Sequence, residues 1–173
     1  TNKMINKRIK LLRNKFNKFN IDGYIVPKND GFFSEYDFHN RLKIISNFKG
    51  SAGLAIILKK KNYLFVDGRY TLQAQQQAGK KFKIIEIHKF LPHKILKNLT
   101  LGFDPNLFTS RQLKIYFKDL LKLKSINENL IDSICPPKKY KTKSFFSIKD
   151  KIVGQNYKLK IKKIIKILKK YKS

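Results

Sequence analysis

The chain has 173 residues, which allow one sizeable buried core and at most the beginning of a second domain. A hydrophobic content of 42% predicts a folded globule and argues against disorder, despite a formal net charge of +29. The single cysteine excludes an internal disulfide framework, and because no apolar run approaches the roughly 20 residues that span a bilayer, we expect a cytoplasmic protein.

The first half of the chain predicts one helix, three strands and a long loop. Apolar residues recur at alternating intervals of four and three from Ile5 to Phe19, with lysine and asparagine between them, as on an amphipathic helix. Two short apolar runs, LAIIL and YLFV, are separated by KKKN and predict a β-hairpin. The expected elements are a helix at 3–19, a buried strand at 24–27, a polar and aromatic loop at 28–40, and hairpin strands at 54–58 and 63–66.

The second half predicts helices that alternate with short strands. The glutamine-rich run after Tyr70 predicts a helix that Gly79 closes in the left-handed conformation, and Ser110 is placed to cap a further helix. The expected elements are a helix at 70–79, a strand at 82–87, a strand at 101–105, a helix at 110–122 and an edge strand at 123–132. This mixture predicts an α/β fold in which a mixed β-sheet is flanked by helices.

The C-terminal part of the chain differs in composition from the rest. The CPP motif at 135–137 and the polar residues after it interrupt the pattern, so a linker is predicted at 136–155. A stripe of apolar residues among lysines then predicts an amphipathic helix at 156–173.

The glycine cluster GSAG at 50–53 invites comparison with phosphate-binding loops. Such a loop continues into Gly-Lys-Ser/Thr and a helix, whereas here Leu54 opens a strand. We therefore predict a tight, close-packed turn that leads into a central strand. Asp67, in the Asp-Gly-Arg that follows the hairpin, is predicted to cap the free N–H groups of the next helix.

Side chains that could catalyse a reaction or bind a metal ion are sparse. His88 and His93 are five residues apart across a proline, which is not the helical spacing of a zinc site, and Cys135 is predicted to be an inert thiol. The one concentration of possible cation ligands lies in a single loop: Asp30, Glu35, Asp37 and His39. Because phenylalanines surround them, surface caps and packing are the preferred interpretation, and no catalytic residue or metal ligand is predicted.

Four segments together carry a resemblance to a known family. They are DGYIVP at 22–27, SEY at 34–36, RLKIISNFKGSAG at 41–53 and YLFVDGRYTLQAQ at 63–75. In this order they resemble the N-terminal domain of the creatinase and aminopeptidase P family. The resemblance covers residues 1–135 and implies a creatinase N-terminal domain with an RNase H-like motif. It also implies that the helix at 156–173 begins a second domain.

The resemblance implies a chain that is not an enzyme by itself. Members of the family are metallopeptidases that remove an amino-terminal residue preceding proline. Their C-terminal domain carries two divalent metal ions, manganese or zinc, held by two aspartates, a histidine and two glutamates. After Asp132 this chain has Asp150 as its only acid, so no metal ion or other cofactor is expected on it.

Partners and site residues follow from the same resemblance. The implied partners are the missing catalytic domain, a second copy in a homodimer of the full-length protein, and a short peptide at the cleft. The implied substrate contacts are Arg69, Glu35, Tyr36 and His39. For Arg69, pairing with Asp67 or Glu35 is an equally weighted alternative. Phe32 and Phe33 stand where many members carry His and Gln.

A stand-alone basic module for nucleic acid or anionic membrane is the alternative function. Of the 40 basic residues, only five are arginine, although the arginine fork is suited to phosphates and bases: Arg8, Arg13, Arg41, Arg69 and Arg111. Lysine is scattered along nearly the whole chain beside abundant isoleucine and asparagine, as AT-rich coding bias produces. We therefore prefer compositional drift and expect neither nucleic acid nor membrane as a partner.

Overall fold

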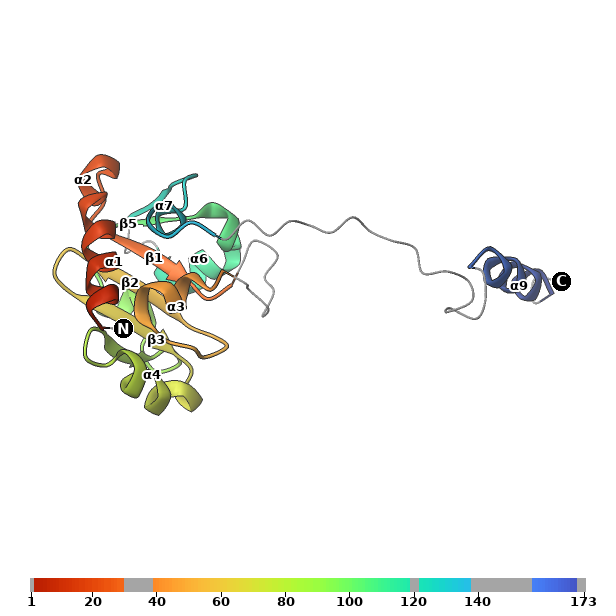
Figure 1. Ribbon diagram of the computed structural model, residues 1–173, viewed down its shortest axis with the longest axis horizontal. Coiled ribbons are helices and arrows are strands. Elements are labelled where there is room, and N and C mark those ends of the chain that lie inside the picture. The colour runs from red at the N-terminus through yellow and green to blue at the C-terminus, as the bar shows by residue number, and fades with distance from the viewer. Residues whose placement is uncertain (1, 30–38, 119–121, 138–156, 171–173) are drawn as a thin grey trace. The chain divides into compact units, whose positions relative to one another are not determined.

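The computed structural model describes residues 2–29, 39–118, 122–137 and 157–170, and it contains two compact units (Figure 1). The first unit, residues 1–138, holds a sheet with its helices. The second, residues 139–173, contains in its described part the helix α9, Tyr157–Lys170, as the apolar stripe predicts. Most of the predicted linker lies outside the described residues, so its boundaries stay a prediction.

The first unit is built on one mixed sheet of six strands in the order β4-β3-β2-β1-β5-β6. The strands are β1 Gly23–Pro27, β2 Leu54–Leu58, β3 Asn62–Val66, β4 Lys83–Glu86, β5 Thr100–Phe103 and β6 Lys122–Ser125. Strand β2 is antiparallel to both of its neighbours, β1 and β3, whereas the remaining pairs are parallel. Five strands therefore run in one direction, and the predicted mixed sheet and hairpin are confirmed.

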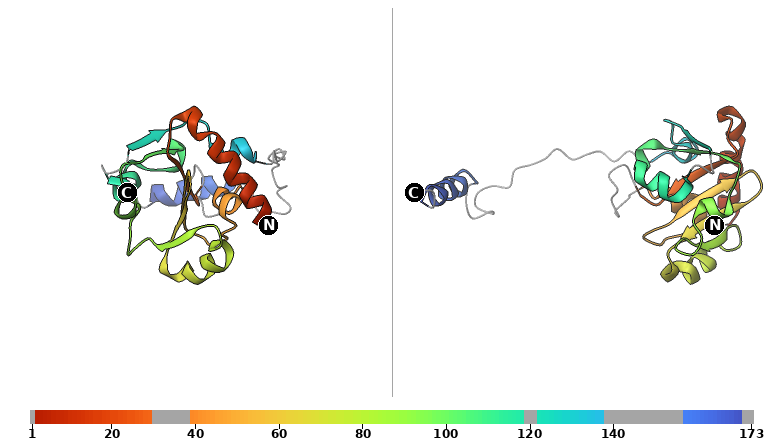
Figure 2. Two further views of the ribbon diagram at one scale, coloured as in Figure 1. Left: turned by 90° about the vertical axis from the view of Figure 1, so that its left-hand side faces the viewer. Right: turned by 180° about the vertical axis from the view of Figure 1, so that it is seen from behind.

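Helices cover both faces of this sheet (Figure 2). The α-helices of the unit are α1 Asn2–Asn14, α2 Phe16–Phe19, α3 Arg41–Ser46, α4 Thr71–Ala78, α5 Pro92–Ile95, α6 Ser110–Phe117 and α7 Leu130–Ile134. Short 3-10 helices follow two of the strand ends: η1 Gly68–Tyr70 and η2 Pro105–Leu107. Residues of α1, α3, α4 and α7 are buried against one face, and α6 is buried against the other.

Successive side chains of a strand point to opposite faces of the sheet, so each apolar side chain packs in one of two layers, the first with α1, α3, α4 and α7 and the second with α6. In β1, Tyr24 and Val26 pack with α1 and α3, whereas Ile25 packs towards α6. In β3, Leu64 joins the first layer and Phe65 joins the second. Because both faces are covered, the central strands are apolar at consecutive positions, as LAIIL and YLFV show in the sequence.

The N-terminal helix forms where the periodicity predicts it, with one interruption. Ile5, Ile9 and Leu12 are buried on α1, and Phe16 on α2 continues the same stripe. The interruption lies at Lys15, whose N–H donates to the carbonyl of Leu12 at 3.0 Å, a tighter i to i−3 bond.

Several local expectations differ from the structure. Residues 41–46, where no regular element is expected, form α3, and the Asn40 side chain caps it by accepting from Lys43 N at 2.9 Å. The second half of the expected edge strand at 123–132 is instead α7, whose N-terminus Asn129 caps. Gly79 closes α4 with φ of −59°, which is not the left-handed conformation.

The cap of α6 is Thr109 and not Ser110. The Thr109 hydroxyl accepts from Gln112 N at 3.2 Å, and the Gln112 side chain accepts from Thr109 N at 2.9 Å. This reciprocal pair is a capping box, and it satisfies two N–H groups that a helix start leaves unpaired.

The glycine turn at 50–53 is packed as closely as the sequence predicts. A Cβ at Gly50 would overlap the ring of Phe48, and one at Gly53 would lie 3.0 Å from a methyl group of Leu42. The turn therefore lets α3 and its following loop pack directly against the start of β2.

Gly23 at the start of β1 offers a test of how tightly this sheet is packed. A Cβ there would lie 2.8 Å from the carbonyl oxygen of Ile57 and 2.5 Å from a methyl group of Leu58. We expect Gly23→Ala to lower the free energy of unfolding by about 1–3 kcal/mol, because the neighbouring backbone cannot move away easily. Chemical denaturation measures this change.

Gly68→Ala is the matched control for that experiment. Its Cβ would meet only the flexible carboxylate end of Glu86, at 3.0 Å, so a smaller loss is expected. Equal losses in the two variants would contradict the proposed packing constraint at β1.

Candidate functional site

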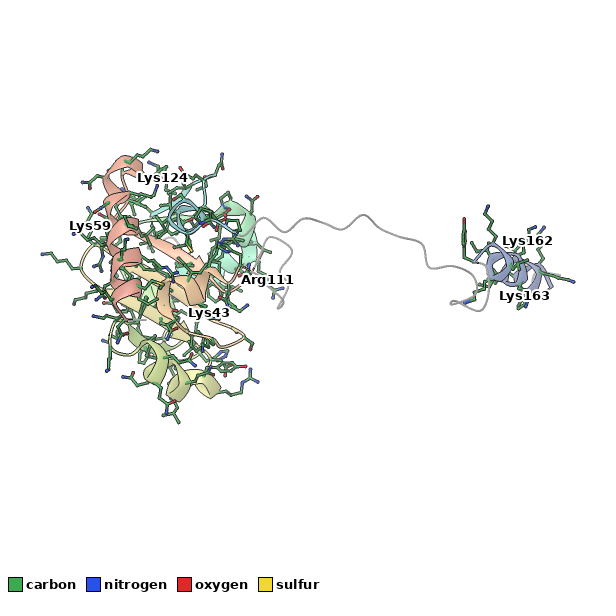
Figure 3. All side chains as sticks on the ribbon, in the orientation of Figure 1. Lys43, Lys59, Arg111, Lys124, Lys162 and Lys163 are labelled. Atoms are coloured by element: carbon green, nitrogen blue, oxygen red, sulfur yellow. The ribbon has the colours of Figure 1, made fainter. Side chains whose placement is uncertain are left out.

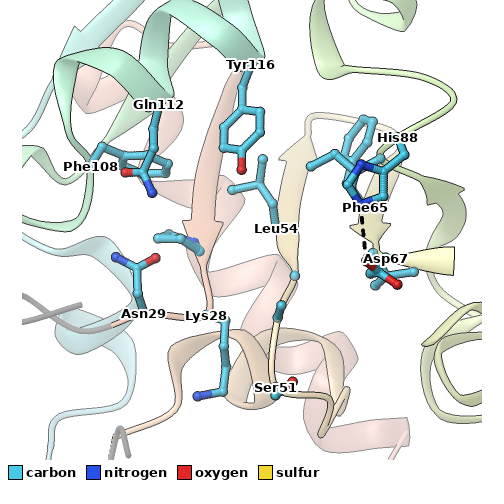
Figure 4. Close-up of a pocket in the computed structure, with 15 residues that line it drawn as sticks. Lys28, Asn29, Ser51, Leu54, Phe65, Asp67, His88, Phe108, Gln112 and Tyr116 are labelled. Atoms are coloured by element: carbon cyan, nitrogen blue, oxygen red, sulfur yellow. Dashed lines mark hydrogen bonds and ion pairs between the residues drawn. The ribbon is translucent and has the colours of Figure 1, made fainter. Parts of the chain in front are cut away.

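The segments that follow β1, β3 and β4 line a pocket of about 310 Å³ at one end of the sheet (Figure 4). These strands are parallel, so their carboxyl ends meet at the same edge. Ligands of α/β proteins bind preferentially at this edge, because the chain turns there leave side chains and backbone groups accessible. This pocket is therefore the candidate site.

An apolar part and two walls that carry polar side chains form the pocket. Leu54 of β2 and Phe65 of β3 line its apolar part. One wall comes from α6 and the segment before it, with Phe108, Gln112 and Tyr116. The facing wall carries Asp67 and His88, and Lys28, Asn29 and Ser51 contribute further polar atoms, as Figure 4 shows.

Asp67 organises the facing wall through both of its carboxylate oxygens. Its Oδ1 accepts from the backbone N of Arg69 at 2.9 Å and from Arg69 Nε at 2.9 Å. Its Oδ2 lies 3.1 Å from His88 Nε2. The predicted capping role of Asp67 is confirmed, and the capped element is the short helix η1 that precedes α4.

These contacts keep the Asp67 carboxylate charged. The hydrogen bonds from Arg69 and, after them, the one from His88 hold the pKa of Asp67 well below its ordinary value of 3.8. Conversely, the Asp67 carboxylate raises the pKa of Arg69. At neutral pH the group is a fixed anion that positions the side chains of Arg69 and His88 and does not donate a proton.

Arg69 is held at its base and exposed at its tip. Its side chain is 79% exposed, and the guanidinium lies 5.7 Å from the centre of the Tyr70 ring. Its Nε donates to Asp67 Oδ1, whereas the terminal nitrogens form no hydrogen bond with a described residue. The alternative pairing with Asp67 is thus present, and contact of Arg69 with a substrate stays a prediction.

Of the other predicted substrate residues, the structure describes only His39. His39 Nε2 is 3.0 Å from Oδ1 of Asp132, a carboxylate that Arg41 also binds through two bonds of 2.8 Å. This cluster joins the start of α3 to α7, and neither His39 nor Arg69 lines the pocket. Glu35 and Tyr36 lie outside the described residues.

The sequence does not reveal that three particular residues line this pocket. Tyr116 and Gln112 come from α6, where the apolar stripe was the only signal. His88, considered above only as a partner of His93, is exposed in the pocket, while His93 is buried and its Nδ1 lies 3.1 Å from the Tyr116 carbonyl. Which side chains meet beyond the strand ends depends on how the chain crosses from one strand to the next. No local pattern in the sequence encodes these crossovers.

The described residues contain neither a metal-ligand cluster nor a membrane-spanning helix. Residues 2–29, 39–118, 122–137 and 157–170 contain no group of three or more His, Cys, Asp or Glu side chains that could hold a metal ion. Within the same ranges, no helix is both long and apolar enough to cross a bilayer.

Comparison with known proteins gives one consistent set of similarities. The family model described as the creatinase/prolidase N-terminal domain matches residues 8–134. A Coprinopsis cinerea protein named "Probable Xaa-Pro aminopeptidase P" is 34% identical over 176 residues, which cover 91% of this chain and 28% of that relative. The chain therefore spans less than a third of the length of this relative.

Solved structures share the fold. An X-prolyl aminopeptidase from Caenorhabditis elegans, described as a cytosolic enzyme with a di-nuclear active site, has a TM-score of 0.61 and 26% identity over 78% of this chain and 26% of its own. The N-terminal domain of the cytoplasmic peptidase PepQ from Mycobacterium tuberculosis has a TM-score of 0.56 at 18% identity, and the match covers 74% of this chain and 98% of that one.

The charge state of Asp67 leads to a prediction on acid stability. Because its pKa is lowered by folding, its stabilising contribution is present above about pH 4 and is lost as the pH falls towards the folded-state value. We expect Asp67→Asn, which keeps a capping side chain, to be less stable than the wild type at neutral pH. The difference shrinks below about pH 4, as thermal unfolding across pH measures. If the stabilities of the two proteins fell in parallel as the pH is lowered, the prediction would be wrong.

Proposed function

Because this chain belongs to the creatinase/prolidase N-terminal domain family, we propose that it is the non-catalytic N-terminal part of an Xaa-Pro aminopeptidase. The relative from Coprinopsis cinerea supports this proposal, since the similar region is a minor part of a longer aminopeptidase. The two divalent metal ions of the reaction, manganese or zinc, would then be held by the remainder of the protein.

The engagement of the acidic residues supports a non-catalytic role. A two-metal hydrolytic site needs several carboxylates that converge on the same ions. Here Asp67 binds Arg69 and His88, and Asp132 binds Arg41 and His39. Both carboxylates are thus engaged by neighbouring cationic or polar side chains, and among the described residues no three His, Cys, Asp or Glu side chains form a group that could hold a metal ion.

The pocket and Arg69 support a role at the rim of a peptide cleft. Asp67 holds the base of the guanidinium, and the terminal nitrogens can donate to a peptide carbonyl or carboxylate. The pocket that Asp67 lines also contains the apolar residues Leu54 and Phe65, which offer a surface for a small side chain. The single observation that carries this role is the fixed but exposed guanidinium of Arg69.

Assembly and location complete the proposal. A homodimer of the full-length protein is proposed on the family resemblance, with this domain contributing to its contacts. A cytoplasmic location is proposed because the similar enzyme from Caenorhabditis elegans is described as cytosolic.

An activity assay on the purified chain is the first test. With a peptide that has proline in second position and added manganese, we expect no release of the amino-terminal residue, since the metal ligands would lie in the missing domain. An active Xaa-Pro aminopeptidase serves as the positive control. Hydrolysis that co-elutes with the chain in gel filtration would overturn the non-catalytic role.

Substitution of Arg69 in the full-length protein tests the cleft. We expect Arg69→Ala to raise KM for an Xaa-Pro peptide about tenfold with little change in kcat, because a charge-assisted hydrogen bond to bound peptide is lost. Arg69→Lys should recover part of the loss. Arg111→Ala, which removes an exposed arginine from α6, is the matched control. An equal effect of both alanine variants, or an unchanged KM, would contradict the assignment.

A further inference from the structure

The end of the sheet opposite the pocket carries a row of exposed lysines, which we call the basic edge. Its members are Lys59, Lys60, Lys61, Lys80, Lys83, Lys97, Lys122 and Lys124. They come from four separate stretches of sequence. In the chain they look scattered, whereas in the fold they lie along one edge.

The topology explains this gathering. The three parallel strands β4, β5 and β6 are each entered after a crossover that returns the chain to the same end of the sheet, and the β2–β3 turn lies there too. Lys83 pairs in register with Tyr63, at the start of β3, and Lys122 pairs with Thr100, at the start of β5. With neighbouring strands about 4.8 Å apart, six strands give the row a length of about 24 Å.

A recess continues the row across β1. Lys59 and Lys124 both line a hollow of about 450 Å³ together with Asp22 and Thr100. Lys124 Nζ is held by the Phe19 carbonyl at 2.8 Å, and Lys59 Nζ lies 3.3 Å from Asp22. Figure 3 shows Lys59 and Lys124 on the same side of the sheet unit.

The charge of the basic edge is largely unopposed. In the described part of the chain, Asp22 is the one acid directly beside a strand end at this edge. Lys60, Lys61 and Lys97 form no ion pair with a described residue. Asp67 and Glu86, by contrast, flank strand ends at the pocket end of the sheet.

We propose that the basic edge binds a linear phosphodiester polyanion, that is, a nucleic-acid backbone, without reading its sequence. A row of point charges matches a line of phosphates, which contribute binding through counterion release. Base readout is not expected, because the guanidinium of the nearby Arg13 already donates to the Leu58 carbonyl at 2.8 Å and to the Asn62 side chain at 2.9 Å.

The apolar surface favours a nucleic acid over a membrane. Peripheral membrane contacts combine basic residues with exposed apolar side chains that enter the lipid. Among the described residues, none of the exposed large hydrophobic side chains of the first unit belongs to a strand or to the β2–β3 turn: Met4, Leu11, Leu72, Phe90 and Ile115. Stacking of bases on aromatic rings is also not expected there, so binding would rest on phosphate contacts.

Three matched triple variants of the 173-residue chain separate this proposal from a general effect of lysine content. The first removes basic-edge lysines as Lys60→Gln, Lys83→Gln and Lys97→Gln. The second removes exposed helix lysines as Lys43→Gln, Lys94→Gln and Lys114→Gln. The third acts on α9 as Lys162→Gln, Lys163→Gln and Lys166→Gln. Each lowers the net charge by the same amount, and circular dichroism verifies folding.

Binding is measured by fluorescence anisotropy at increasing salt concentrations. The probes are single-stranded oligonucleotides of two sequences, a duplex, and vesicles that contain anionic phospholipid. We expect both single-stranded sequences to bind equally. The basic-edge variant should bind at least about tenfold more weakly at low salt, with a salt slope shallower by about 2, and the other two variants should change much less. The duplex shows whether the backbone is recognised in double-stranded form as well.

Several results would overturn the proposal. Equal losses in all three variants would mean that net charge alone drives binding, and a loss confined to the α9 variant would assign binding to that helix. Absence of oligonucleotide binding at low salt, or capture of vesicles alone, would exclude a nucleic-acid backbone as the partner. None of these results bears on the cleft role of Arg69, which is tested by KM.

Discussion

Helices cover both faces of the sheet, so residues beyond the strand ends reach solvent through the loops and turns at its two ends. Five of the six strands run in the same direction, so one end gathers carboxyl termini of strands and the other gathers amino termini. The pocket occupies the first end, and the basic edge occupies the second. Strands of four or five residues separate the two by about 15 Å, so each surface has its own electrostatic environment.

Short-range polar contacts give the pocket end its order. Asp67 caps η1 with one oxygen and holds His88 with the other, so a single carboxylate sets the positions of two side chains. Asp132 acts similarly towards Arg41 and His39, and in doing so connects α3 with α7. Because these carboxylates are engaged within the domain, they stabilise its local structure at both places.

Buried polar contacts also fix the helix that closes the unit. The Tyr24 hydroxyl, deep in the core, accepts from Leu130 N at 3.3 Å, and burial raises the pKa of this tyrosine above its usual range. Asp104 accepts from the Asn129 side chain at 2.9 Å, next to the cap of α7. These bonds tie α7 to β1 and to the end of β5, although they are distant in sequence.

The sequence by itself determined the N-terminal helix, the hairpin, the cap at Asp67 and the family resemblance, because each depends on residues within a short window. The sequence did not reveal α3, since six residues are too few to show a helical period. The predicted last strand also ran into α7, because the cap at Asn129 was not recognised. Only the tertiary structure decided which side chains meet. Tyr116 and His88 line the same pocket, and Lys83 lies near the β2–β3 turn. Crossovers bring these distant strand ends to a common edge of the sheet, and no local pattern in the sequence encodes that arrangement.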